Sequence, residues 1–353
     1  MALYAPAVLF VSLRDLQWRR RRFLIGVLAT GLVFALTVVM SGVDASFHNE
    51  INRVVNAFSA DKWIVPADVS GPFTSTSVFA QDEVKKISSL AGVAAAEPVA
   101  FFRATVKTKR VTDLNLIGIT VGGMVEPKVV DGHGLRGSGD LVVDKSLGLK
   151  LGEKITLVGQ KFTVVGRTSG LTYFAGTPAA FATLGDLQKG GFAGAPLATA
   201  IVVRGSPTSL PTGYRALTNA EVKSDLGRPM KRATSTISVI TYLLWAIAAG
   251  IMGSVLYLQA IERTRDFAVF KATGVTSRSL LWGLAVQASL LALCAAATAL
   301  IVSLALGPSF SIPVQVPTSA YVALPIVAVV IGLLASLVAL RRAVTVDPAL
   351  AFG

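Results

Sequence analysis

The chain has 353 residues, of which 53% are hydrophobic and only 15% are charged, whereas charged residues make up about a quarter of a typical soluble domain. Lysine and arginine outnumber aspartate and glutamate by 33 to 20, which gives a net charge of +13. The single cysteine, Cys294, excludes an internal disulfide framework and a cysteine-based zinc site. This composition excludes an ordinary soluble domain and is typical of a membrane protein.

The N-terminal segment combines an apolar face with a cluster of arginines. In residues 1–22, apolar side chains alternate with Arg14, Gln17 and Arg19–Arg22, which predicts an amphipathic helix at the cytoplasmic interface with Trp18 at headgroup depth. Residues 23–41 carry no charge and form the first predicted membrane span. The alternative is a signal peptide, but that needs a shorter apolar core and a small-residue cleavage site. We therefore interpret 23–41 as an uncleaved span.

Residues 42–235 are predicted to form one α+β domain inserted between the first and second spans. Alternating side chains in 154–158 and 161–165, on either side of Gly159-Gln160, predict a β-hairpin. Apolar residues spaced along 81–90 predict a helix. Further strands are expected at Trp63–Val65, Ala100–Lys107, Leu114–Thr120, Asp140–Val143 and Thr199–Val203. Helical extensions of the neighbouring spans are expected at 44–58 and 219–234.

Three more spans follow the domain. Residues 236–260 are uncharged, and no acidic or basic residue occurs from Ser279 to Leu340. A bilayer core of about 30 Å needs about 20 residues of helix. Prolines and a glycine in 307–320 divide the long uncharged stretch into spans at 280–306 and 321–340, joined by a short external loop. The chain is thus predicted to cross the membrane four times.

The distribution of basic residues predicts the orientation. Arginine and lysine are in excess in 1–22, in the loop 261–279 and in the tail 341–353, while 307–320 carries no charge. Short segments rich in lysine and arginine remain in the cytoplasm. We therefore expect both termini to be cytoplasmic and 42–235 to be extracytoplasmic, in the plasma (inner) membrane. The basic charge reflects topology, so nucleic acid is not an expected partner.

The apparent motifs of the extracytoplasmic domain do not form a predicted active site. Gly132–Gly137 matches G-x-G-x-x-G, but a strand-like segment follows it, whereas a dinucleotide site needs a helix there. His48 and His133 lack metal-ligand spacing. Asp131, His133 and Ser138 could suggest a hydrolase triad, but no nucleophile elbow supports it. No phosphate-binding loop occurs either. We expect no catalytic, cofactor or metal site, and no ATP hydrolysis by this chain.

The spans contain no ionisable group for proton coupling, and four helices are few for enclosing a solute path. Small residues in the last span permit a close helix contact, either with a second copy of the chain or within the same chain. They are Gly332, Ala335, Ser336 and Ala339. These features predict a half-unit that pairs in the membrane lipid and takes its energy from another subunit.

The loop 261–279 is the candidate contact for that subunit. It begins with charged residues and continues with apolar ones, and Gly274 suits a helix C′ position, with Thr276 or Ser277 capping the next helix. A helix–turn–helix projecting into the cytoplasm could transmit force, and an interfacial loop that only follows the charge rule is the alternative. The candidate coupling residues are Glu262, Arg263, Thr264, Arg265, Asp266, Phe267, Phe270, Lys271, Gly274, Thr276 and Arg278.

The segment 262–274, ERTRDFAVFKATG, closely resembles the cytoplasmic signature of FtsX/MacB-like permeases of ABC transporters (the type VII ABC superfamily), and Val346–Phe352 resembles their closing motif. Residues 13–22 and 140–166 are similar to their opening segment and periplasmic core. The DevC-like permeases, which have no fused ATPase domain, are the most similar group. The resemblance implies a homodimer of permeases on a dimer of separate cytoplasmic ABC ATPase subunits, which bind ATP and magnesium.

The resemblance also implies mechanotransmission. The permease subunit would couple ATP hydrolysis to movement of the extracytoplasmic domain, for export or extraction of an extracytoplasmic or lipophilic substrate, with an extracytoplasmic protein as a further partner. The alternative is an FtsX-like signal transmitter that activates a cell-wall hydrolase, although the outer domains of FtsX are generally smaller. A membrane-anchored enzyme is disfavoured because no catalytic constellation is present.

Overall fold

The computed structural model describes residues 20–75, 77–107, 111–262, 264–272, 274–306 and 316–344. Residues 1–19 of the expected interfacial helix, most of the loop 307–320 and the end of the tail lie outside the described residues, and residues 20–22 form the beginning of the first spanning helix. Within the described ranges, four helices are long and apolar enough to cross a membrane. The chain divides into two compact units, residues 1–46 with 234–353 and residues 47–233, and each is described by itself.

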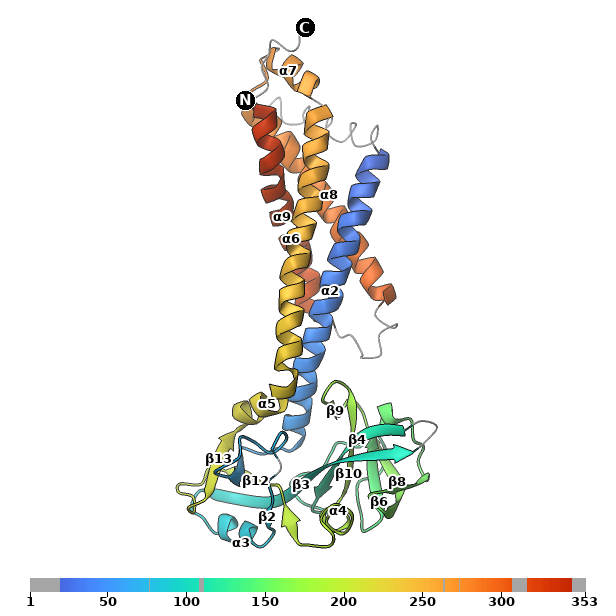
Figure 1. Ribbon diagram of the computed structural model, residues 1–353, viewed down its shortest axis with the longest axis vertical. Coiled ribbons are helices and arrows are strands. Elements are labelled where there is room, and N and C mark those ends of the chain that lie inside the picture. Colours follow the sequence, from blue (N-terminus) through green and yellow to red (C-terminus); the bar gives the residue numbers. More distant parts are fainter. Residues whose placement is uncertain are drawn as a thin grey trace. The chain divides into compact units, whose positions relative to one another are not determined.

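The membrane unit is a bundle of four helices. They are α2 (Arg20–Ala57), α6 (Lys231–Glu262), α8 (Ser277–Leu306) and α9 (Thr318–Val344), drawn in Figure 1. A buried cluster takes side chains from all four helices, including Phe34, Met252, Ala292 and Leu324, and Phe34 lies 5.4 Å from Trp245 between ring centroids. Each helix extends beyond the predicted span, and α2 continues to Ala57, as expected for 44–58.

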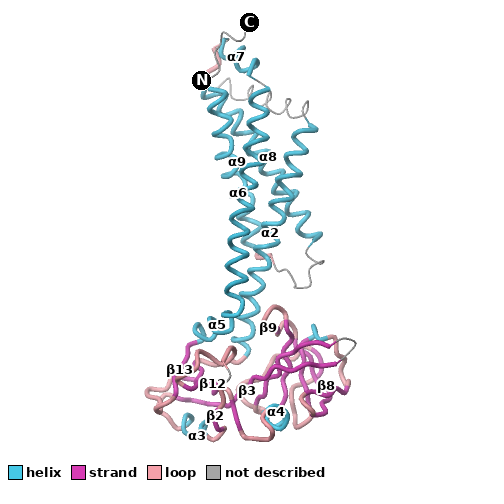
Figure 2. The backbone as a smooth tube through the Cα atoms, in the orientation of Figure 1, coloured by secondary structure: helices cyan, strands magenta, loops and turns pink. Residues whose placement is uncertain are grey.

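The second unit contains a long mixed sheet, and Figure 2 shows that the strands gather there. The strand order is β13-β1-β12-β3-β4-β10-β6-β8-β5, with β7 paired to β8 and β9 to β10, while β11 and β2 form a separate pair. The strand bounds are β1 Lys62–Pro66, β2 Phe79–Ala80, β3 Val93–Lys107, β4 Val111–Ile119, β5 Asp131–Gly132, β6 Asp140–Asp144, β7 Lys154–Leu157, β8 Gln160–Thr168, β9 Thr172–Tyr173, β10 Thr177–Thr183, β11 Leu197–Ala198, β12 Ala200–Gly205 and β13 Tyr214–Thr218.

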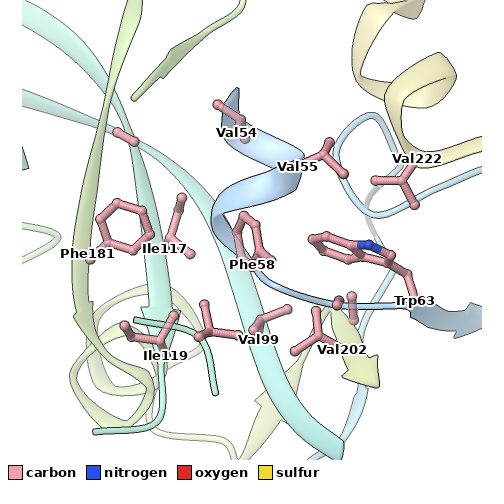
Figure 3. Close-up of a cluster of buried hydrophobic side chains, with 14 of the residues drawn as sticks. Val54, Val55, Phe58, Trp63, Val99, Ile117, Ile119, Phe181, Val202 and Val222 are labelled. Atoms are coloured by element: carbon pink, nitrogen blue, oxygen red, sulfur yellow. The ribbon is translucent and has the colours of Figure 1, made fainter. Parts of the chain in front are cut away.

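Helices cover both faces of the sheet because successive strand residues point to opposite faces. Trp63 and Val202 lie in one buried cluster, whereas their neighbours Ile64 and Val203 lie in another. The first cluster also holds the end of α2 and residues of α5 (Asn219–Gly227), and Figure 3 shows Phe58 beside Trp63 there. The opposite face packs on α3 (Glu83–Ser88) and α4 (Leu184–Gly191). The domain is therefore a sheet between two layers of helices.

Three buried aspartates fix turns of this domain. Asp144, 2% exposed, accepts hydrogen bonds from the amides of Ser146 and Leu171 at 3.0 and 2.8 Å. Asp186, 4% exposed, accepts from the Ser138 hydroxyl at 2.5 Å and the Gly139 amide at 2.9 Å. A buried carboxylate is stable only when its oxygens are hydrogen-bonded or paired. These residues therefore act as structural ties between loops.

The third aspartate, Asp225 on α5, holds the segment Ser70–Ser75, which we call the Phe73 loop. It is 1% exposed and accepts hydrogen bonds from the amides of Phe73 and Thr74 at 3.0 and 3.3 Å, and from the Thr74 hydroxyl. Arg228 lies 3.8 Å from the same carboxylate. The Phe73 ring can therefore reach into the aromatic cluster around Phe58.

The structure confirms the predicted hairpin, in which Leu157 pairs with Gln160, and each predicted strand overlaps an observed one. The expected helix in 81–90 is present but shorter, as α3. The segment Gly132–Gly137 joins β5 to β6 and opens no helix, as expected for a turn. The expected helical lead into the second span is broken in two at residues 228–230, where a short 3-10 turn containing Pro229 separates α5 from α6.

Candidate coupling region

The candidate coupling residues form a short helix between two membrane-spanning helices. Helix α6 ends at Glu262, α7 runs from Thr264 to Ala272, and α8 begins at Ser277. Gly274 has φ +89°, the left-handed conformation that a glycine adopts without steric cost after a helix end. Helix α8 then begins at the residue after Thr276. The predicted helix–turn–helix is thus present, with the glycine where the sequence places it.

Packing holds this region against the ends of α6 and α8. Ala268 of α7 is fully buried. Val275 in the turn packs on a small buried cluster formed by Leu256 and Ala260 of α6 and by Leu284 and Ala288 of α8. The sequence analysis did not single out Val275, because one apolar residue in a polar turn gives no periodicity. These contacts join the turn to both spanning helices.

The polar residues of the region lie on its surface. Glu262, Arg265, Asp266, Gly274 and Thr276 are exposed. Thr264 is half-buried, and its hydroxyl donates a hydrogen bond to the Ile261 carbonyl at 2.6 Å, which is local to the helix end. Arg263 lies outside the described residues, as do the side chains of Phe267, Phe270, Lys271 and Arg278. The described part of the region therefore offers exposed charged side chains beside a buried residue of α7, Ala268, and the packed turn residue Val275.

The small residues of α9 face other helices of the same chain. A side chain at Gly332 would lie 2.9 Å from the Met252 Cε atom and 3.1 Å from the Ala288 carbonyl oxygen. Ala335, 8% exposed, belongs to the bundle core. The side chains of Ser336 and Ala339 lie outside the description. The alternative of close packing within the chain accounts for Gly332 and Ala335, and dimer packing through these residues stays a prediction.

Each of the domain residues that could suggest a triad has a partner outside the triad. Asp131 forms ion pairs with Lys145 at 2.9 Å and Arg167 at 3.0 Å. The Nδ1 atom of His133 is 2.7 Å from the Gly134 carbonyl, and Ser138 donates to Asp186. Among the described residues, no group of three histidine, cysteine, aspartate or glutamate side chains could hold a metal ion.

Two domain carboxylates have lowered pKa values. The hydrogen bond from Lys145 lowers the pKa of Asp131, and the charge of Arg167 adds to the effect. Burial raises the pKa of Asp186, but hydrogen bonds from Ser138, Gly139 and Thr183 outweigh burial and leave it below the ordinary value. Both acids are therefore held ionised by structural partners, which is unsuitable for proton transfer near neutral pH.

Similarity to known proteins decides the family. Residues 238–348, which include the coupling region, match the model of the FtsX-like permease C-terminal family. The chain is 43% identical over 347 residues to the uncharacterized ABC transporter permease Rv2563 of Mycobacterium tuberculosis (strain ATCC 25618 / H37Rv), covering 98% of this chain and 99% of that protein. The chain belongs to the FtsX-like ABC transporter permeases. A second relative of this permease, the uncharacterized ABC transporter permease Rv0072 of the same strain, is 38% identical over 347 residues, covering 98% of this chain and 99% of that protein.

The periplasmic region of MacB from Actinobacillus actinomycetemcomitans is a similar solved structure. It is 13% identical, with a TM-score of 0.37, and the match covers 50% of this permease and 96% of that chain. Similarity at this level carries no information about activity. Membership of the ABC permeases itself implies an ATPase as partner and a multi-pass membrane location.

Proposed function

We propose that this permease is a non-catalytic half-unit that couples ATP hydrolysis by a separate ATPase to movement of its α/β domain, for export or extraction of a lipophilic or extracytoplasmic substrate. In this proposal the permease chain binds no cofactor, and ATP and magnesium are bound by the partner. A homodimer of permeases would assemble with two ATPase subunits in the plasma membrane. The observation that carries the proposal is the short helix α7 with its exposed charged residues, followed by a turn in which Val275 packs on both neighbouring spanning helices.

The structure of α7 supports a mechanical role for residues 262–278. A docking partner moves a neighbouring element only if the contact segment is attached to it. Val275 provides that attachment because it packs on the ends of α6 and α8, and Ala268 of α7 is itself buried. Arg265 and Asp266 are exposed. An interfacial loop that merely obeys the charge rule would not need an apolar residue in its turn that packs on both spanning helices.

The connection to the α/β domain supports the second half of the proposal. Helix α2 is unbroken from Arg20 to Ala57, and its last turns place Val54 and Val55 in the main core of the domain. Val222 and Leu226 of α5, which leads into α6, enter the same core. A shift of α2 or of α5 would therefore displace side chains of this core, because protein interiors are close-packed and do not deform continuously.

Loss of coupling is tested by replacing Arg265 and Phe267 with alanine together. We expect the copurified ATPase to lose its stimulation by the permease, while the variant still inserts into the membrane. The matched control is Arg204→Ala, an exposed arginine of β12 in the α/β domain, which should leave the stimulation unchanged. Unchanged stimulation in the double variant would remove the coupling assignment.

The proposed orientation is tested separately by cysteine labelling of intact cells with a membrane-impermeant maleimide, after Cys294→Ala removes the native thiol. A cysteine introduced at Lys161, exposed on β8, should react from outside. One introduced at Thr276 should react only after permeabilisation. The reverse pattern would place the α/β domain in the cytoplasm and contradict the proposal.

A further inference from the structure

A short loop of the α/β domain has a strained backbone. Strands β9 and β10 form a hairpin in which Tyr173 pairs with Thr177. The residues between them, Phe174, Ala175 and Gly176, have φ values of 57°, 64° and 86°, and we call them the Phe174 loop. Residues other than glycine rarely adopt this left-handed conformation, and then singly. A phenylalanine and an alanine in succession therefore store strain, and the surrounding structure must hold them in place.

The end of α2 contacts the hairpin on both sides of β9. The Gly176 amide donates a hydrogen bond to the Glu50 Oε1 atom at 2.8 Å. One turn further along α2, the guanidinium of Arg53 lies against Gly170, where an added side chain would overlap with the Nη1 atom. Residues three positions apart share one face of a helix. A single face of α2 thus touches the chain before β9 and the loop after it.

Burial shows that the Glu50 contact belongs to the packing of the domain. Glu50 is 6% exposed, and a buried carboxylate is stable only when it is hydrogen-bonded or paired. Val54, on the same face of α2, belongs to the buried cluster that also contains Leu171 and Tyr173. The Phe174 ring packs against this cluster, and its centroid lies 5.0 Å from that of Tyr173. The Phe174 loop is therefore held by the core through its ring and by Glu50 through its backbone.

The hydrogen bond from Gly176 to Glu50 is sensitive to small movements of α2. Its length of 2.8 Å is close to the optimum, and at about 3.6 Å no hydrogen bond remains. Helices in switching proteins shift by about 1–2 Å. Helix α2 is unbroken from Arg20 to Ala57, so the membrane-spanning part and Glu50 belong to one helix. A shift of that size would separate Glu50 from Gly176 and leave the strained loop without this hydrogen bond.

We propose that the Phe174 loop is a strained latch, which Glu50 of α2 holds closed and which opens when α2 is displaced. Opening relieves the left-handed backbone and withdraws the Phe174 ring from the core, so that movement of a membrane helix changes the surface of the domain. This inference rests on the proposed function, in which α2 moves, and it names an element that the movement releases. The competing explanation is that the hairpin alone fixes the loop.

Amide hydrogen exchange in the full-length permease in detergent tests the latch, and mass spectrometry reads it at Gly176. When reclosing is faster than exchange, the exchange rate follows the open population. We expect Glu50→Ala to accelerate exchange at Gly176 at least about tenfold, because a hydrogen bond to a charged group is lost. Glu50→Gln keeps an acceptor oxygen and should show a smaller increase. The control is Glu126→Gln, at an exposed glutamate.

Wild-type exchange at Gly176 in Glu50→Ala would overturn the proposal and leave the hairpin as the explanation. Exchange in the central strand β4 reports whether the variant is folded. If Glu50→Ala accelerates exchange in β4 as well, Glu50→Gln decides: an increase confined to residues 171–177 supports the latch, and wild-type exchange there overturns it.

The stored strain is tested by Ala175→Gly, since glycine adopts a positive φ without steric cost. This variant should favour the closed loop and slow exchange at Gly176. The matched control is Ala193→Gly, at an alanine after α4 with φ 52°, which should leave exchange at Gly176 unchanged. Equal or faster exchange in Ala175→Gly would show that the loop stores no strain and would overturn the proposal.

The link to α2 is tested in the complex with the partner ATPase. ATP should accelerate exchange at Gly176 relative to the nucleotide-free complex. If ATP has no effect although the permease stimulates the ATPase, the latch is overturned and the coupling proposal stands. If the permease does not stimulate the ATPase, the coupling proposal fails, and the variants of Glu50 and Ala175, which need no ATPase, still decide on the latch.

Discussion

Removal of the Asp225 carboxylate should release the Phe73 loop from α5. Asp225→Ala leaves two amides and one hydroxyl without their acceptor. A hydrogen bond to a charged group contributes about 1.5–3 kcal/mol, but the loop donors are only part-buried and regain water when the loop opens. We therefore assign about 3 kcal/mol in total to loop opening, which corresponds to about a hundredfold increase in the open population.

Chymotrypsin provides the assay because its cleavage site at Phe73 is half-buried in the folded loop. When opening is fast relative to cleavage, the cleavage rate follows the open population. We expect cleavage after Phe73 to accelerate about a hundredfold in Asp225→Ala. Asp225→Asn keeps one acceptor oxygen and should show a smaller increase. Asp82→Asn, whose side chain is 84% exposed, is the control. A wild-type cleavage rate in Asp225→Ala would refute the assignment of the loop to this carboxylate.

Two further predictions concern buried polar groups. The lowered pKa of Asp186 means that its stabilising effect is complete above the ordinary aspartate pKa of about 4 and is lost as the pH falls through the lower folded-state value. Melting curves should therefore show a smaller loss of stability between pH 7 and pH 3.5 in Asp186→Asn than in the wild type. The control is the exposed Asp68→Asn, which should behave like the wild type. Equal losses in Asp186→Asn and the wild type would contradict this prediction. Neither amide atom of Gln287, 2% exposed in α8, has a hydrogen-bond partner among the described residues. Gln287→Leu should stabilise the fold by about 1–2 kcal/mol, because the cost of burying an unsatisfied amide is removed, and it should raise the melting temperature in detergent by a few degrees. A lower melting temperature would indicate that a bound water or a partner satisfies the amide.

The sequence predicted those strands whose two faces differ in environment. The strands of the β7–β8 hairpin alternate because one face is more deeply buried than the other, most clearly in β8. Strand β10 was missed, although it is central, pairing in parallel with β4 and antiparallel with β6. Its segment TPAAFAT is buried along most of its length, so it shows no alternation, and alanine gives little β-propensity.

The first half of β3 was missed for a different reason. Pro98 lies within it, and proline argues against an interior strand because it cannot donate to the ladder. In the structure Pro98 pairs with Ile201, but Val99 faces β12, so the nitrogen of Pro98 points to the other edge. Pairing with β4 begins only at Ala100. The proline therefore removes no hydrogen bond, and only the register of the neighbouring strands reveals this.

In the coupling region, too, the sequence predicted the local backbone structure but not the packing between distant segments. Gly274 and the polar residues around it indicated a helix end and a turn, because backbone conformation and capping depend on local residue type. The packing of Val275 on the cluster that α6 and α8 form together depends on how distant helices meet, and no local pattern encodes it. A single apolar residue next to a glycine in a polar turn is the only signal that the sequence offered.

The small residues of α9 illustrate why a packing motif predicts an approach but not a partner. A glycine permits two helix backbones to come close, whichever chain the second helix belongs to. At Gly332 the neighbouring backbone is that of α8, where the Ala288 carbonyl oxygen would lie 3.1 Å and the Ala292 Cβ atom 3.3 Å from an added side chain. The glycine is thus already required by the fold of one chain. A dimer interface on α9 would then depend on residues outside this contact, so substitutions at Gly332 would weaken the bundle itself and would not report on dimerisation alone.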